Sequence, residues 1–316
     1  MSGNDSGDKN IDCFKEIGLI LIIIFLCAEP AYPLQCIETE HKFDIRPGAD
    51  QPSDLDIGPD GLIYIVDGVN NRIIVVDGEG KSKFNFGSEG SDRGEFRRPM
   101  GLDVSSSGRV FIADTGNQRI QVFDRKGMFL YMFKVTATDG SRSDPVDVAV
   151  SELDDYLYVS DNDNHRIAVY GQDGSFRFHV GSFGEDYGKF RYPATMVLNE
   201  FNELLVVDVI NTRVQKFDPF GNYITSIGSW GILPGQLFRP KGVALDSRGR
   251  VYISDSYMGV VQVFTENGKF LGAICIDGRK KVFRTPVGLV IDKYDRLLTV
   301  EMRDNKVSVL QLTGQE

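Results

Sequence analysis

Short strings of alternating apolar and polar residues recur along most of the chain, and residues 108–133 show the pattern most clearly. Three alternating or β-branched runs follow one another there, at 110–113, 120–123 and 129–133. They are separated by Asp-Thr-Gly-Asn and Asp-Arg-Lys-Gly, residue types that favour turns. Runs this short, with a period near two, are typical of antiparallel strands rather than helices. The pattern therefore predicts a succession of short strands.

The same pattern returns at a nearly constant interval, and a proline opens each copy. The prolines are Pro52, Pro99, Pro145, Pro193, Pro240 and Pro286, which by subtraction lie 47, 46, 48, 47 and 46 residues apart. The first five copies predict four strands each, and the last predicts three. An all-β repeat with a period in the forties is typical of β-propeller blades.

The last copy ends after its third strand, and the segment Cys36–Arg46 is the candidate for the missing one. This segment precedes the first proline and resembles residues 81–86, the fourth strand of the first copy. If it pairs with the C-terminal strands, the two ends of the chain close the ring and no open sheet edge remains. We therefore expect an all-β, six-bladed propeller over residues 36–316, closed by an N-terminal strand that completes the C-terminal blade.

One copy carries a motif that can be compared with known repeats. Pro99-Met-Gly-Leu-Asp-Val is followed by Phe111-Ile-Ala-Asp-Thr-Gly-Asn-Gln-Arg-Ile-Gln-Val-Phe123, which resembles the NHL repeat nearly residue for residue. The resemblance extends from Asp44 to the C-terminus and implies a six-bladed propeller of the NHL type. It indicates the fold more strongly than the function. The motif's aspartate recurs as Asp67, Asp114, Asp161, Asp208 and Asp255, with Glu301 in the last copy.

The recurrent Asp, Asn and Arg of this motif favour a structural role. Each occurs once per copy, so they cannot converge on one reacting atom. We expect the Asp and Asn side chains to bond within the turn after the second strand, and the Arg to reach a carboxylate across the seam between blades. The segments 94–99, 188–193 and 235–240 should each place an apolar side chain between blades.

Residues 1–35 differ from the rest of the chain. Residues 18–28 are an uninterrupted apolar run that suits a signal peptide and is shorter than the roughly 20 residues that span a bilayer. The preceding segment is acidic, which is atypical of a signal. We expect an exported protein, with cleavage and retention as a short membrane anchor both open, and membrane contact only through this segment.

Cysteine content and net charge indicate which compartment and which kind of partner suit this protein. Cys36 and Cys275 would remain after cleavage, and an oxidising compartment permits a disulfide between them, but the sequence alone leaves their pairing open. The formal net charge of −10 argues against a nucleic-acid partner. The RNA-binding role of NHL propellers in animal regulators would require one basic face on this acidic body.

A candidate metal site lies at the channel. Asp54 and Asp147 occupy the channel-facing position at which the repeat prefers glycine, and Thr195 shares that position. Their carboxylates could hold Ca²⁺, or could be solvated charges at a rim. Related propellers include calcium-dependent lactonases and a zinc-dependent amidating lyase, but the three histidines here (His41, His165 and His179) lie outside the innermost strands, which disfavours zinc.

A candidate binding face is formed by the loops that lead into each proline and by the turns between second and third strands. Trp, Tyr and Arg are common anchors of protein interfaces. The candidates there are Arg97, Arg98, Tyr187, Arg191, Tyr192, Trp230, Phe238, Arg239 and Tyr257. For Trp230, packing within its loop is the alternative to partner contact.

These observations favour a non-enzymatic, extracytoplasmic binding or assembly scaffold that recognises another extracytoplasmic protein and needs no cofactor. The alternative is a calcium-dependent hydrolase or lyase with its site at the central channel.

Overall fold

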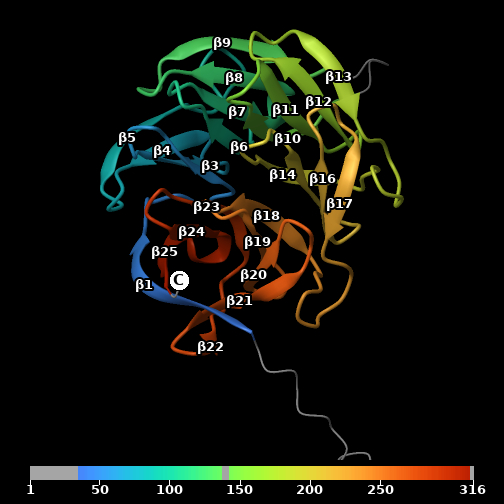
Figure 1. The fold of residues 1–316 in the computed structure, drawn as a ribbon. Coiled ribbons are helices and arrows are strands. Elements are labelled where there is room, and N and C mark those ends of the chain that lie inside the picture. The colour runs from blue at the N-terminus through green and yellow to red at the C-terminus, as the bar shows by residue number, and fades with distance from the viewer. Residues whose placement is uncertain (1–34, 137–141, 314–316) are drawn as a thin grey trace, which may run out of the picture. The chain divides into compact units, whose positions relative to one another are not determined.

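The computed structural model describes residues 35–136 and 142–313, and residues 35–316 form one compact unit by their contacts. The unit is built almost entirely of short antiparallel strands (Figure 1). Two 3₁₀ turns, η1 (Thr115–Asn117) and η2 (Met302–Asp304), are its only helical elements within the described residues. No helix in this part of the chain is long and apolar enough to cross a membrane. The leader expected over residues 1–35 lies outside the described residues, apart from Gln35.

Four sheets of four antiparallel strands follow the first four prolines, and each sheet begins with its innermost strand. The first sheet is β2 (Leu55–Ile57), β3 (Ile63–Asp67), β4 (Arg72–Val76) and β5 (Ser82–Phe86); the second is β6 (Pro99–Val104), β7 (Val110–Asp114), β8 (Arg119–Phe123) and β9 (Phe129–Lys134); the third is β10 (Pro145–Val150), β11 (Tyr156–Asp161), β12 (Arg166–Gly171) and β13 (Phe176–Val180); the fourth is β14 (Pro193–Leu198), β15 (Leu204–Asp208), β16 (Arg213–Phe217) and β17 (Tyr223–Ile227).

The remaining strands form one larger sheet, which the N-terminal strand β1 (Cys36–Ile45) holds together. β1 pairs antiparallel with β25 from Thr39 to Ile45, the pairing that the sequence predicts. It also pairs in parallel with β21 over Cys36–Glu38, which the sequence did not predict. The other members are β18 (Pro240–Leu245), β19 (Arg250–Asp255), β20 (Val260–Thr265), β21 (Phe270–Ile276), β22 (Arg279–Lys280), β23 (Pro286–Ile291), β24 (Arg296–Glu301) and β25 (Lys306–Leu312).

The innermost strands contact one another in a closed circuit. The order is β2, β6, β10, β14, β18 and β23, and β23 contacts β2 again. The sheets therefore surround a central axis, as in a β-propeller, and a cluster of buried apolar side chains fills each seam between neighbouring sheets.

The loops that lead into three of the prolines each supply an apolar side chain to a seam. Phe96, Phe190 and Leu237 are fully buried, as the sequence predicts. Phe96 packs in one cluster with residues of both sheets that flank it. In the third loop Leu237 fills the seam, so the neighbouring Phe238 lies outside it, against Tyr257, with ring centroids 4.4 Å apart.

The repeated aspartate organises the turn after the second strand. Asp114 is fully buried and accepts hydrogen bonds from Asn117 Nδ2 at 2.9 Å and from the backbone N–H of Arg97 at 2.8 Å. Arg119 Nε donates to the same carboxylate at 2.7 Å. The prediction that this arginine reaches across the seam is wrong, because β7 and β8 pair antiparallel and place Asp114 directly opposite Arg119 in one sheet.

A disulfide links Cys36 to Cys275, which the sequence left open. Their Cα atoms lie 5.4 Å apart, although 239 residues separate them in the sequence. The parallel pairing of β1 with β21 brings them together, because Cys36 is in register with Ala273 and Glu38 with Cys275. The bond therefore ties the start of the compact unit to β21.

We expect the double variant Cys36→Ser, Cys275→Ser to be less stable by about 2–5 kcal/mol, because it frees a long loop in the unfolded chain. The measurement is chemical unfolding of the oxidised wild type and of the variant. As a control, a reducing agent should lower the midpoint of the wild type and leave that of the variant unchanged. Equal midpoints for the oxidised wild type and the variant would contradict a stabilising role for the bond.

Candidate functional site

Two cavities lie along the axis of the unit and share a wall. The lower cavity, of about 610 Å³, is lined by the C-terminal halves of the innermost strands. The upper cavity, of about 520 Å³, is lined by the starts of these strands and by the loops that precede them. Asp54, Thr195 and Gly288 line both cavities. The cavities therefore form one channel with a waist at these residues.

The waist consists of the residues that stand two positions after each proline. Asp54 and Asp147 are there, next to glycines such as Gly101 and Gly288. A Cβ atom on Gly288 would collide with Asp54 Oδ1, and one on Gly101 would collide with Asp147 Oδ1. The carboxylates thus fill the space that the two glycines leave open.

Both waist aspartates are bound to the neighbouring sheet. Asp54 Oδ2 accepts a hydrogen bond from the backbone N–H of Leu102 at 3.1 Å, and Asp147 Oδ2 accepts one from Met196 at 2.7 Å. Asp54 is only 8% exposed and Asp147 only 3% exposed. The alternative that they are solvated rim charges is therefore wrong, because closure of the ring buries them.

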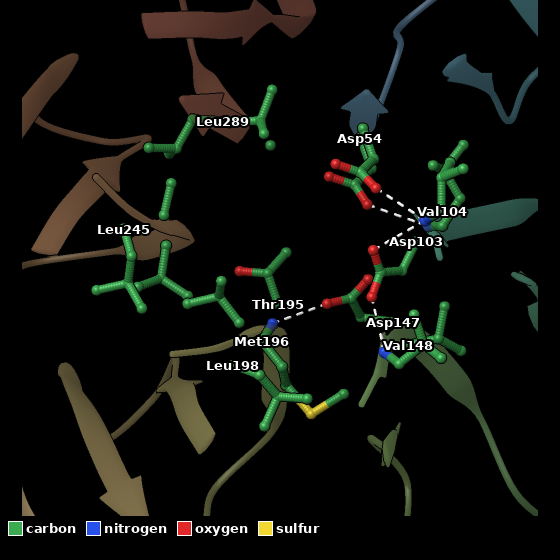
Figure 2. A pocket seen from close by; sticks show the side chains of 18 of the residues that line it. Asp54, Asp103, Val104, Asp147, Val148, Thr195, Met196, Leu198, Leu245 and Leu289 are labelled. Atoms are coloured by element: carbon green, nitrogen blue, oxygen red, sulfur yellow. Dashed lines mark hydrogen bonds between the residues drawn. The ribbon is translucent and has the colours of Figure 1, made fainter. Parts of the chain in front are cut away.

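One oxygen at the waist has no partner. Asp147 Oδ1 is buried and makes no hydrogen bond within the described part of the chain. Figure 2 shows the carboxylates of Asp54, Asp103 and Asp147 gathered on one side of the lower cavity. Buried carboxylate oxygens rarely lack a donor, so this atom marks a place where a proton or a ligand would be stabilised.

Asp56 and Asp103 join this cluster, and the sequence analysis did not single them out. Asp56 Oδ2 accepts a hydrogen bond from Val104 N–H at 2.8 Å, and Asp103 Oδ2 accepts one from Val150 N–H at 2.7 Å. Both stand four positions after their proline, where the other copies have Ala or Val. Comparison of that single position across the copies would have found them.

The lower cavity is therefore asymmetric. Its acidic wall comes from β2, β6 and β10, while β14, β18 and β23 present side chains such as Leu198, Leu245 and Leu289 (Figure 2). A site of this kind can bind a cationic group against the acidic wall and an apolar group against the opposite wall.

Burial shifts the ionisation of all four aspartates. It raises the pKa of Asp54 to about 7 in spite of the hydrogen bonds from Leu102 and Leu55. Burial, and then the charge of Asp54, raise the pKa of Asp147 well above its ordinary value. Burial and the nearby Asp103 do the same for Asp56, and burial raises the pKa of Asp103. Burial thus favours the protonated form of these carboxyls, and perturbed carboxyls in a cavity are typical of functional sites.

The sequence-predicted binding residues share one end of the sheets. Because the strands alternate in direction, the second-to-third-strand turns and the loops into each proline lie at the same end. Trp230, Tyr187 and Tyr257 are there, 71%, 70% and 68% exposed. Tyr257 leans on Phe238, and Tyr187 stacks on Tyr223 with ring centroids 5.0 Å apart. Packing of Trp230 within its loop, the alternative considered above, is wrong because its side chain is mostly exposed.

The remaining candidates divide into two groups. Arg98, Tyr192 and Arg239 come together at the upper cavity and form part of its wall. Arg97 is exposed outside the cavity lining, and Arg191 pairs with Glu185 at 2.6 Å.

Comparisons with known proteins agree with this architecture. The NHL repeat family model matches residues 96–123 and 239–264, so the chain carries NHL repeats. A search of curated proteins finds no match to the sequence.

Solved structures with similar folds include enzymes. A streptogramin B lyase structure superposes with a TM-score of 0.63 at 17% identity, over 86% of this chain and 97% of that one. A catalytically inactive virginiamycin B lyase from Staphylococcus aureus, solved with quinupristin, gives 0.59 at 15% identity, over 83% and 80%. A selenomethionine-substituted virginiamycin B lyase from the same organism gives 0.59 at 14% identity, over 86% and 100%. At such identities the likeness shows the fold alone, that of a β-propeller.

The raised pKa of Asp54 predicts a pH-dependent stability. Its pKa of about 7 in the folded protein lies above the value of about 3.9 in an unfolded chain. The folded state therefore binds the proton more tightly, and this stabilisation is present below about pH 4 and lost as the pH rises to about 7. We expect Asp54→Asn, which cannot ionise, to raise the free energy of unfolding at pH 8 by about 4 kcal/mol relative to its effect at pH 4.

Chemical unfolding at both pH values tests this, with Glu200→Gln as the control, since Glu200 is an exposed carboxylate on the rim of the same cavity. An equal effect of Asp54→Asn at pH 4 and pH 8 would contradict the shifted pKa.

Proposed function

We propose that this protein is a non-enzymatic, six-bladed NHL-type propeller, exported from the cytoplasm, that recognises another extracytoplasmic protein through the loops of one face. Six blades agree with the closed circuit of innermost strands, if β1 belongs with β23, β24 and β25. Export agrees with the apolar segment at residues 18–28 and with the disulfide, a bond that persists in oxidising compartments.

The observation that carries the proposal is the group of exposed aromatic side chains on one face. Trp230 and Phe183 hold equivalent places in their loops, since each pairs through a single β-bridge with the buried side of its own loop. The exposed fraction of Phe183 is 65%, similar to the 71% of Trp230. Large aromatic side chains held out by rigid loops lose little entropy on binding, which suits interface anchors.

We expect the double variant Trp230→Ala, Tyr257→Ala to weaken binding of the partner protein by about tenfold or more, because such anchors carry much of the binding energy of an interface. The experiment captures interacting proteins from an extracytoplasmic fraction with the wild type, identifies them, and measures the Kd of each purified candidate for both forms.

Phe220→Ala is the matched control. Phe220 is the most exposed aromatic residue among the described residues, at 81%, and lies in the turn between β16 and β17 at the opposite end of the sheets. A partner whose affinity falls with Phe220→Ala and not with the double variant would move the interface to the other face.

A second candidate function is that of a cation-dependent hydrolase or lyase with its site at the channel. The unpartnered Asp147 Oδ1 favours it. Asp54 and Asp147 would hold the cation, and buried carboxylate oxygens suit Ca²⁺. A bound cation would polarise a carbonyl or a leaving group of the substrate. The fit is partial, because no third Asp, Glu, His or Cys atom converges with these two at ligand distance within the described residues.

If this site binds Ca²⁺, the ion must raise the stability of the folded state. We expect Ca²⁺ to raise the Tm by several degrees relative to EDTA, and the double variant Asp54→Asn, Asp147→Asn to abolish the shift. Calorimetry with Ca²⁺, Mg²⁺ or EDTA measures it, and Glu200→Gln serves as the control. An unchanged Tm would remove the cation-dependent candidate and leave the scaffold proposal intact.

A further inference from the structure

The upper cavity has a chemistry of its own, distinct from the acidic wall of the lower one. We propose that it binds the carboxylate end of an apolar molecule, with Lys241 and Arg239 holding the carboxylate and the apolar residues of the cavity holding the chain. This goes beyond the proposed function and does not depend on it, because the ligand would enter the channel rather than cover the face.

The inner ring of the cavity is mostly apolar and carries one cation, which is half-buried. The residues that directly follow the prolines form its inner ring: Ser53, Met100, Val146, Ala194, Lys241 and Val287. Val209, Ile210 and Met302 extend the apolar wall. A ring of this composition would bind an apolar chain and offer a single fixed place for a charge.

Lys241 is the group in this cavity that an anion would stabilise most directly. It is half-buried on β18, and neither an ion pair nor a hydrogen bond occupies its ammonium in the part of the chain that the structure describes. Burial and the positive charge of Arg239 lower its pKa. Two cations that share a cavity without an acceptor repel each other, and a bound carboxylate would relieve that repulsion.

Three neutral polar groups of the cavity are already engaged. Their hydroxyl groups donate to backbone carbonyls: Ser53 to Met100 at 2.6 Å, Thr115 to Pro145 at 2.6 Å and Thr195 to Lys241 at 2.5 Å. The cations are therefore the charged groups that remain to bind an anion, and the Tyr192 hydroxyl lies in the same wall.

The acidic groups of the cavity limit the charge of that anion. Asp54 lies at the floor, and Asp144 lies at the rim, where Arg98 partly offsets its charge. Both carboxyls would repel a second negative charge on the ligand, so a monoanionic carboxylate fits better than a phosphate dianion.

The test measures binding of octanoate to the full chain at neutral pH by titration calorimetry, with octanol and octanamide, two uncharged analogues, as matched probes. We expect saturable binding of one octanoate per chain, and binding of the other two at least about tenfold weaker. Lys241→Met should weaken octanoate binding about tenfold or more, Arg239→Gln should weaken it by less, and Lys241→Arg should retain it. Lys126→Met, at an exposed lysine in the turn between β8 and β9, should change nothing.

Circular dichroism of each variant establishes that it is folded. If Lys241→Met does not fold, Arg239→Gln and the comparison of the three probes still decide the outcome. Equal binding of octanol and octanoate, or unchanged octanoate binding in folded Lys241→Met, would overturn the proposal.

A free organic acid and the C-terminus of a peptide both supply this chemistry. A short apolar peptide with a free C-terminus, compared with its C-terminal amide, distinguishes them. Tighter binding of the free-acid peptide than of octanoate would identify a peptide C-terminus as the ligand. Tighter binding of octanoate than of the peptide would identify a small organic acid. Failure of octanoate and of both peptides to bind would overturn the proposal and leave the partner-binding face untouched.

Discussion

The pairing of β1 with β25 is the interaction on which the arrangement of this protein depends. Each sheet buries its faces against its neighbours, so an open row of sheets would leave two faces uncovered. β1 joins the two ends of the row because it leads along the chain into the first sheet and pairs with β25, the last strand. It also pairs with β21, and the bond between Cys36 and Cys275 fixes that second pairing. The channel exists only because the row is closed.

Closure also explains the ionisation of the channel. Asp54, Asp103 and Asp147 come from three successive sheets, and each accepts a hydrogen bond from the backbone of the next sheet. The glycines beside them provide the room. On an isolated sheet each carboxylate would face water, but in the closed ring they lie close together along one wall of the channel with less water around them, and their pKa values rise. Such a cluster costs stability, which makes the channel a natural place to look for function.

The two ends of the molecule offer different surfaces. The end with the proline-leading loops presents exposed aromatic side chains around a mouth that contains cations, and the other end opens into the acidic cavity. The likeness to the streptogramin and virginiamycin lyases concerns the fold, and a propeller fold is compatible with binding as well as with catalysis.

The sequence by itself determined the strands, their repetition, the closing role of the segment before Pro52 and the channel position of Asp54 and Asp147. These features follow from the alternation of apolar residues and from turn chemistry, which act over a few residues and recur in register. The burial of Phe96 and Phe190 between sheets was predictable in the same way. Tertiary structure alone decided the disulfide, the convergence of Asp56 and Asp103 with the waist, the lone oxygen of Asp147 and the place of Lys241 in an apolar ring. Those features join residues from different repeats, and only closure of the ring sets the distances between them and removes the water around their charges.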